Sequence, residues 1–320
     1  MLIPSLALIA GLVALLWSAD RFIDSASGMA ALLGAPPIFI GIVVIGFGTS
    51  APELMVSAMA ALEGSPELAL GNAFGSNTAN IGLVLGIMAC LYPVTSRSRV
   101  IRVELITLVL ITLLAGGLLI NGQLGRLDAT ILLLAFMVLL GISIRRSFAD
   151  DDVLAETSVR PAASAGKIAR TLALLVISLI LLLLASRLLV WGAVEVARGL
   201  GVSELIIGLT VVALGTSLPE LASGIAALRK GEHDLALGNI LGSCLFNTLA
   251  VVGLAAAIAP FTVGPELLYR DWLIMFLLAS LLLLHSLFQR NATFRVPRAS
   301  GVFLIVVYFS YLIWLVTGAR

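Results

Sequence analysis

Gly48-Thr49-Ser50-Ala51-Pro52-Glu53 lies inside an apolar run long enough to cross a membrane, and it recurs as Gly215-Thr216-Ser217-Leu218-Pro219-Glu220. The two copies are separated by a constant offset of 167 residues. Across Ile40–Asn80 and Ile207–Asn247, 19 of the 41 aligned positions are identical. Chance would give roughly one in ten for so biased a composition. The chain therefore contains an internal duplication.

A second polar stripe follows each copy, over Gly71–Asn80 and Gly238–Asn247. Asn72, Ser76 and Asn80 are spaced by four residues, which places them on one face of a helix. Thr49 and Glu53 share a face for the same reason, and the second copy repeats both spacings. We expect the facing stripes to form a cage of carboxylate, hydroxyl and amide oxygens. Such oxygens suit hard cations such as Ca²⁺ and disfavour zinc and copper.

The acidic residues and the prolines of the repeat both need a partner inside a membrane. A carboxylate at mid-span costs on the order of 3 kcal/mol. Pro52 and Pro219 lack an N–H and displace the carbonyl one turn back, so carbonyls near Gly46–Gly48 and Ala213–Gly215 are released. A bound cation would satisfy both kinds of group. Broken helices at matched places in two halves are typical of the central site of a transporter.

The composition predicts an all-α polytopic membrane protein. Of the 320 residues 60% are hydrophobic and 12% are charged, and the mean hydropathy is +1.14. The net charge of +1 gives no reason to expect nucleic-acid binding. Cys90 and Cys244 both lie in apolar segments and are interpreted as core residues. The first apolar run lacks a basic leader and is expected to be a retained spanning helix.

Apolar runs near the length that a spanning helix needs occur ten times. We predict spans at 3–19, 37–62, 68–92, 103–120, 127–145, 171–190, 204–228, 235–260, 271–289 and 301–317. The hydrophilic stretch between them divides the chain into a first repeat at 1–145, a cytoplasmic linker at 146–170 and a second repeat at 171–320.

The positions of the basic residues predict the orientation. Fourteen of the 19 Lys and Arg residues fall in one alternating set of loops, which includes the linker. Because basic loops stay in the cytoplasm, we expect the linker inside and both termini outside. With five spans each, the halves must then have opposite orientations. This is the inverted-topology plan of secondary transporters, here in an integral, multi-pass protein of the plasma (inner) membrane.

The paired G-T-S-x-P-E and G-N-x-x-G-S-x-x-x-N motifs resemble the α-repeats of the cation/calcium exchanger superfamily, and the chain is most similar to its small prokaryotic calcium/sodium antiporters. The resemblance extends over the whole chain. It implies exchange of Ca²⁺ for Na⁺ by alternating access, at a mid-membrane site built from Glu53 and Glu220. It also implies that the ion ligands are Glu53, Glu220, Thr49, Ser50, Thr216, Ser217, Ser76, Ser243, Asn80 and Asn247, with the main-chain carbonyls of Gly46 and Ala213. Of these, Glu53, Glu220, Thr49 and Thr216 would bind Ca²⁺ and Na⁺ as metal ligands.

One departure concerns the charge of the site. Some similar prokaryotic proteins carry Asp at the position of Asn247, whereas here both matched positions, Asn80 and Asn247, are Asn. The site then holds two negative charges and not three. The pairs Asn77/Cys244 and Ser57/Gly224 also break the symmetry of the two halves.

Three alternatives remain open at this point. A proton/calcium exchanger could use the same glutamates, since buried carboxylates can carry protons. A sodium-coupled transporter of an organic solute would need groups other than small polar residues in the stripes. An enzyme is not expected, because the two histidines lie far apart and no H-E-x-x-H motif occurs. We expect Ca²⁺ and Na⁺ as substrates and the lipid bilayer as environment, with no cofactor, no nucleic acid and no obligate protein partner.

Overall fold

The structure is a computed structural model that describes residues 2–64, 66–149, 165–200, 213–289 and 293–318. It is helical apart from two short ribbons. Over this part of the chain, eight helices are long and apolar enough to cross a membrane, or nine if the two helical stretches on either side of Ser50 count as one span. The predicted span at 204–228 and the predicted linker at 146–170 fall partly outside the described residues.

The chain forms two compact units, and each combines segments from both sequence repeats. Unit 1 comprises residues 1–49 and 142–239, and unit 2 comprises residues 50–141 and 240–320. The sequence repeats reflect a duplication, whereas the two units are defined by contacts between residues. The units therefore do not test the predicted division into repeats at residues 145 and 171, which stays a prediction. Unit 1 contains α1 (Leu2–Leu33), α2 (Pro37–Ile40), η1 (Gly41–Gly46), α3 (Phe47–Thr49), α10 (Ala165–Gly199), α12 (Ala213–Thr216), α13 (Leu218–Arg229) and the start of α14 (His233–Phe246).

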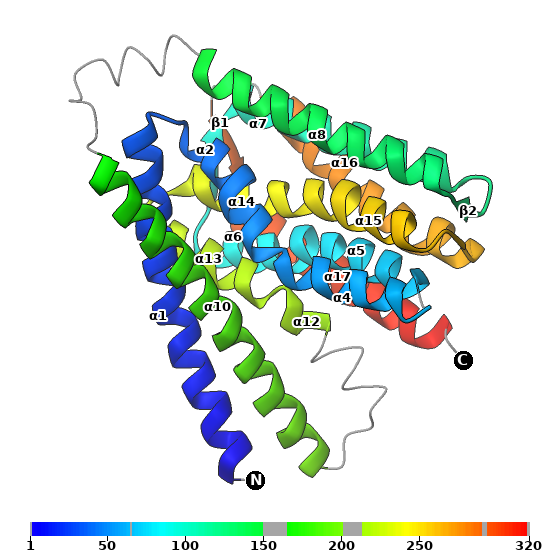
Figure 1. Ribbon diagram of the computed structural model, residues 1–320, viewed down its shortest axis with the longest axis horizontal. Coiled ribbons are helices and arrows are strands. Elements are labelled where there is room, and N and C mark those ends of the chain that lie inside the picture. The colour runs from blue at the N-terminus through cyan, green and yellow to red at the C-terminus, as the bar shows by residue number, and fades with distance from the viewer. Residues whose placement is uncertain (1, 65, 150–164, 201–212, 290–292, 319–320) are drawn as a thin grey trace. The chain divides into compact units, whose positions relative to one another are not determined.

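Two long helices, α1 and α10, lie side by side in unit 1 (Figure 1). A Cβ added at Gly11 would stand 2.7 Å from the main-chain nitrogen of Leu189, and one at Gly192 would stand 2.7 Å from that of Leu8. Glycine at these two places therefore lets the two backbones touch. This contact joins the first helix of each repeat.

Both of these helices are longer than the sequence predicted, namely Leu2–Leu33 against 3–19 and Ala165–Gly199 against 171–190. The charges after residue 19 suggested a helix end, but the helix continues and its acids are paired. Lys230 Nζ lies 2.6 Å from Asp24 Oδ1 and 2.7 Å from the main-chain oxygen of Asp20. Ser27 donates to Glu232 Oε1 at 2.6 Å. These polar groups of α1 thus bind the turn between α13 and α14.

Unit 2 contains most of the remaining helices and both ribbons. Its elements are α4 (Ala51–Leu62), α5 (Pro66–Ala79), η2 (Asn80–Val84), α6 (Leu85–Leu91), β1 (Val94–Arg97), α7 (Ser98–Leu119), β2 (Gln123–Leu124), most of α8 (Arg126–Ala149), the end of α14, η4 (Asn247–Val251), α15 (Val252–Ile258), β3 (Phe261–Thr262), η5 (Leu267–Trp272), α16 (Leu273–Phe288), β4 (Thr293–Val296) and α17 (Arg298–Gly318). Strand β1 pairs antiparallel with β4, and β2 pairs antiparallel with β3.

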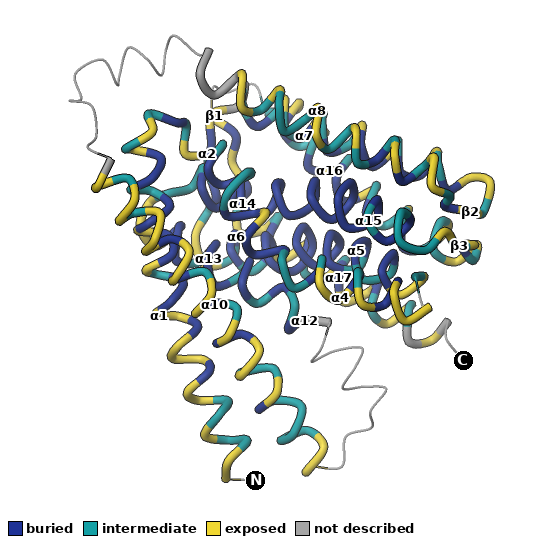
Figure 2. The backbone as a smooth tube through the Cα atoms, viewed as in Figure 1, coloured by how far each residue is buried: buried dark blue, intermediate teal, exposed yellow. Residues whose placement is uncertain are grey.

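Among the candidate spans of the described residues, the continuous helical stretches that carry the second polar stripes are the most buried. In Pro66–Leu91 and His233–Ile258, 78% and 83% of the most apolar window is buried, against 22% in Leu2–Leu33 (Figure 2). Small residues allow close packing around them in unit 2. Ala61, Ala69 and Ala255 form one cluster between α4, α5 and α15. The polar stripes therefore lie in the interior, whereas α1 leaves most of its apolar surface for lipid.

Candidate functional site

Each repeat motif breaks its helix at the same place. Ser50 and Ser217 leave helical geometry with ψ near zero, and α4 and α13 begin directly after them with Pro at the first or second position. Proline is tolerated there because the first turn needs no N–H donor. Glu53 and Glu220 consequently lie in the first turn of their helices, where the helix dipole favours negative charge. Both side chains are completely buried.

The main chain of each glutamate is held by an asparagine from the next helix. In unit 2, Asn72 Nδ2 donates to the main-chain oxygen of Glu53 at 3.2 Å and to Ser57 Oγ at 3.1 Å. In unit 1, Asn239 Nδ2 donates to the main-chain oxygen of Glu220 at 3.2 Å. These bonds fix the helix hairpin beside each carboxylate in the same way.

The serine that completes this arrangement has changed position between the repeats. The position matching Ser57 is Gly224, and the sequence alone marks this as a break in symmetry. In the structure Asn239 Nδ2 donates instead to Ser223 Oγ, one position earlier, at 2.9 Å. The second repeat therefore keeps the asparagine–serine contact although the motif letters differ.

In unit 1, hydroxyl groups bind the main chain around the helix breaks. Thr49 Oγ1 lies 3.1 Å from the main-chain oxygen of Ile45 and 3.0 Å from Asn239 Oδ1. Ser186 on α10 donates to the main-chain oxygen of Gly215 at 3.1 Å. Gly215 is four residues before Pro219, so its carbonyl is the one that proline releases. A serine hydroxyl satisfies this carbonyl here, although the sequence suggested a cation for that role.

In unit 2, the second stripes of both repeats lie on contacting segments. Helix α4, which carries Glu53, packs against α5 and against η4, and α5 also packs against η4. Asn80 is the first residue of η2 and Asn247 is the first residue of η4. Both segments are π-helical, a geometry that is frequent at functional sites. The first-repeat carboxylate and the second-repeat Asn247 thus belong to helices that touch.

The amides of Asn80 and Asn247 are buried without protein partners. Both side chains are completely buried, and within the described residues neither the oxygen nor the nitrogen of either amide has a hydrogen-bond partner. The hydroxyl of Ser217 in unit 1 is in the same situation. A buried polar group without a partner costs about 1–3 kcal/mol. Such groups indicate places where a ligand or water binds.

The structure divides the predicted ligands between the two units. Unit 1 holds Gly46, Thr49, Ala213, Thr216, Ser217 and Glu220, and unit 2 holds Ser50, Glu53, Ser76, Asn80, Ser243 and Asn247. Each unit therefore carries one of the two buried glutamates. Thr216 is half-buried, and the others whose side chains are described are buried. The roles of Asn72, Asn239 and Ser223 were missed, although Asn72 and Asn239 stand in the predicted stripes.

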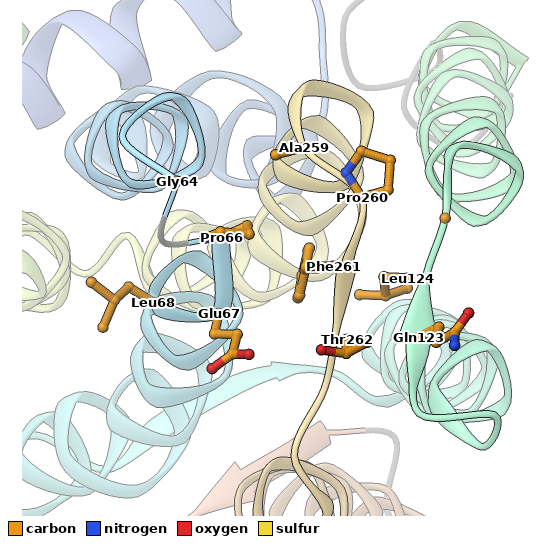
Figure 3. A pocket seen from close by; sticks show the side chains of 11 residues that line it. Gly64, Pro66, Glu67, Leu68, Gln123, Leu124, Ala259, Pro260, Phe261 and Thr262 are labelled. Atoms are coloured by element: carbon orange, nitrogen blue, oxygen red, sulfur yellow. The ribbon is translucent and has the colours of Figure 1, made fainter.

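A large hollow in unit 2 lies apart from these residues. It has a volume of about 980 Å³ and lies where the α4–α5 turn meets the β2–β3 ribbon (Figure 3). Its lining includes the apolar side chains of Leu68, Leu124 and Phe261 and the polar side chains of Glu67, Gln123 and Thr262. Since no predicted ligand lines it, this hollow is distinct from the candidate site.

The chain matches known proteins along nearly its whole length. The family described as sodium/calcium exchanger protein matches residues 4–145 and 170–317. CaxA of Alkalimonas amylolytica is 41% identical over 314 residues, which is 97% of this chain and 98% of that protein. Sodium/calcium exchanger MaX1 of Methanosarcina acetivorans is 27% identical over 96% of this chain and 97% of its own length.

A solved structure shows the same fold. The sodium-calcium exchanger NCX_Mj, soaked with 10 mM Na⁺ and zero Ca²⁺, superposes with a TM-score of 0.84 and 26% identity over 98% of both chains. The proteins of the matched family are membrane transporters and not enzymes, they carry Na⁺ and Ca²⁺ as substrates, and they need no cofactor. The protein described above, with its buried glutamates and repeated motifs, is an integral multi-pass membrane protein that belongs to the sodium/calcium exchanger family.

Proposed function

We propose that this protein exchanges Ca²⁺ for Na⁺ by alternating access, and that Glu53 and Glu220 both bind the transported ion. The observation that carries the proposal is the pair of completely buried carboxylates at matched positions of the two repeats. Uncompensated charge at mid-membrane is costly. One Ca²⁺ or two Na⁺ would neutralise the two carboxylates. Binding of either kind of ion would therefore offset the free-energy cost of the buried negative charge.

The other proposed ligands are neutral oxygens from both repeats. They are the hydroxyls of Thr49, Ser50, Ser76, Thr216, Ser217 and Ser243, the amides of Asn80 and Asn247, and the main-chain oxygens of Gly46 and Ala213. Ca²⁺ takes six to eight oxygens, which two carboxylates alone do not supply. The buried amides of Asn80 and Asn247, which have no hydrogen-bond partner among the described residues, support this assignment because a cation or its water would satisfy them.

The choice of Na⁺ as counter-ion rests on the relatives and on the chemistry of the ligands. MaX1 and NCX_Mj are both named as sodium/calcium exchangers. Hydroxyl and amide oxygens suit Na⁺ but do not release protons near neutral pH. A proton/calcium exchanger would use only the two glutamates as proton carriers. That alternative leaves the neutral oxygens without a role in counter-ion binding.

For the architecture we propose ten membrane spans in two inverted repeats, with both termini on the outer side of the plasma membrane. The matched motifs and the basic residues support this arrangement. In the proposed transport cycle α1 and α10 move as a pair. Their close backbone contact at Gly11 and Gly192 supports this, because a pair packed so closely can move as one body. Their long apolar faces would slide against lipid.

The proposed function is tested by calcium uptake into proteoliposomes that contain the purified protein. Radioactive Ca²⁺ outside is combined with a Na⁺ gradient directed outward, or with a proton gradient directed outward and no Na⁺. We expect uptake that requires Na⁺ inside and disappears when K⁺ replaces it. Uptake driven by the proton gradient at the same rate would favour the proton/calcium alternative, and uptake by neither gradient would refute exchange.

A further inference from the structure

The amide of Asn77 on α5 is held in one orientation by the second repeat. Its Nδ2 lies 2.8 Å from Thr248 Oγ1 and 3.2 Å from the main-chain oxygen of Cys244, with Met275 Sδ at 3.3 Å. The hydroxyl hydrogen of Thr248 is donated to the same Cys244 oxygen at 2.8 Å. The Thr248 oxygen can therefore only accept, so the nitrogen of the Asn77 amide must face it.

The other end of this amide has no partner. Asn77 is completely buried, and its Oδ1 accepts no hydrogen bond from any of the residues that the structure describes. The side-chain oxygen and nitrogen of Asn80 also have no hydrogen-bond partner among the described residues. Asn80 follows Asn77 by three residues and therefore lies on the same face of the helix. The contacting segment η4 begins at Asn247, which repeats the pattern. Within the described residues, three buried amides whose oxygens lack partners are thus gathered on two touching segments of unit 2.

The unpartnered amide atoms of Asn77, Asn80 and Asn247 indicate which kind of ligand would bind them. Asn80 and Asn247 are already among the proposed ion ligands, but Asn77 is not. An amide oxygen is a hard, neutral ligand of the kind that Na⁺ and Ca²⁺ bind. At the matched position of the second repeat stands Cys244, whose sulfur is a soft ligand. The oxygen at position 77 therefore has no counterpart in the second repeat.

We propose that Asn77 Oδ1 is a further oxygen ligand of the transported cation, contributed by the first repeat alone. This inference rests on the proposed function. The tether from Nδ2 to Thr248 and to the Cys244 main chain fixes the direction of the oxygen, and the lack of a donor among the described residues leaves it for the ion. The two inverted halves then offer unequal sets of oxygens, so the ion meets a site that is not symmetric.

The test compares two variants that separate the oxygen from the tether. Asn77→Ala removes both, whereas Thr248→Val removes the main acceptor of the tether and keeps Oδ1. Binding is measured on the purified protein as the rise in melting temperature with added Na⁺ or Ca²⁺, with K⁺ as control, and exchange is measured in proteoliposomes. We expect Asn77→Ala to raise the half-saturating concentrations of Na⁺ and Ca²⁺ about tenfold or more. Thr248→Val should raise them less than about threefold.

Two outcomes of the comparison between Asn77→Ala and Thr248→Val would overturn the inference. Unchanged half-saturation in Asn77→Ala would mean that Oδ1 meets only water. Equal rises in both variants would mean that Asn77 acts only as a tether between helices. If Asn77→Ala does not fold, Asn77→Asp decides, since it loses the N–H donors to Thr248 and Cys244 but keeps a side-chain oxygen for the ion and adds negative charge. It should bind Ca²⁺ at least about tenfold more tightly, and unchanged Ca²⁺ affinity would also overturn the inference.

The binding measurement keeps this inference separate from the proposed exchange. If the parent protein binds Ca²⁺ but shows no Na⁺-driven uptake, the proposed exchange fails. The comparison of Asn77→Ala with Thr248→Val still decides whether Asn77 is an ion ligand, because melting temperatures do not depend on transport.

Discussion

The side chain of Asn239 binds the main chain of Glu220: Asn239 Nδ2 donates a hydrogen bond to the main-chain oxygen of Glu220 at 3.2 Å. Asn72 holds Glu53 at the same distance in the first repeat. The carboxylates themselves take no part in these bonds, so the helix hairpin can be fixed while each acid remains available for the proposed ion. In the proposed site, the main-chain oxygen of each glutamate would thereby fix the hairpin and its carboxylate would bind the ion.

Loss of the asparagine in the second repeat should cost more stability than loss in the first. Asn239 is almost completely buried and also accepts from Thr49 at 3.0 Å, whereas Asn72 is half-buried. Asn239→Ala should therefore lower the free energy of unfolding by about 1–3 kcal/mol, and Asn72→Ala by less. Melting temperatures of the two purified variants check this. An equal or larger loss in Asn72→Ala would contradict the stated difference.

Both glutamates should be indispensable for transport and not for folding. Glu53→Gln and Glu220→Gln keep the size of each buried side chain and remove its charge, so the site would keep one negative charge and would no longer balance Ca²⁺. We expect each variant to elute as folded protein and to lose Na⁺-driven Ca²⁺ uptake. Glu67→Gln is the matched control, because Glu67 is exposed at the end of the same hairpin, and it should transport normally. Normal uptake by either buried variant would remove that acid from the site.

The repeated motifs allowed the family, the helical class and the candidate ligands to be predicted. Spacing by three and four residues is preserved in any helix, so the polar stripes could be read without coordinates. The end of α1 could not be predicted, because Asp20 and Asp24 looked like charges at the membrane surface. Only the fold shows Lys230 beside them. A sequence-based prediction ends a spanning helix at its first charged residues, because the distant residues that pair with them are not known.

The local distortions around the site also escaped prediction. The π-helical segments that begin at Asn80 and Asn247 keep the composition of ordinary helix. Strands of two and four residues are too short for alternation to be visible. The exchange of Ser57 for Ser223 as partner of the asparagine involves a shift of one position. When the two repeats are aligned at the constant offset of 167 residues, the serine is lost at the matched position. In the structure, the asparagine–serine hydrogen bond is kept.

The predicted orientation can be tested at two exposed positions of unit 2. Asn121 precedes β2, and Thr293 begins β4. In a Cys90→Ser background, Asn121→Cys should react with an impermeant thiol reagent added to intact cells. Thr293→Cys should react only after the cells are opened, because its loop belongs to the basic, cytoplasmic set. The reverse pattern of labelling would invert the proposed topology.

The charge of the site can be changed at Asn247, whose segment η4 packs against α4, the helix of Glu53. Asn247→Asp would add a third carboxylate near the first-repeat glutamate. Like charges in a low-dielectric site disfavour joint ionisation, so one carboxylate should take up a proton. We expect initial Na⁺-driven Ca²⁺ flux to depend more steeply on pH between about 6 and 8 than in the parent. Asn80→Asp, the matched change, should behave alike if both repeats serve one site. Intact transport with unchanged pH profiles would mean that these asparagines do not adjoin the carboxylates, and a single shared cage could not be maintained.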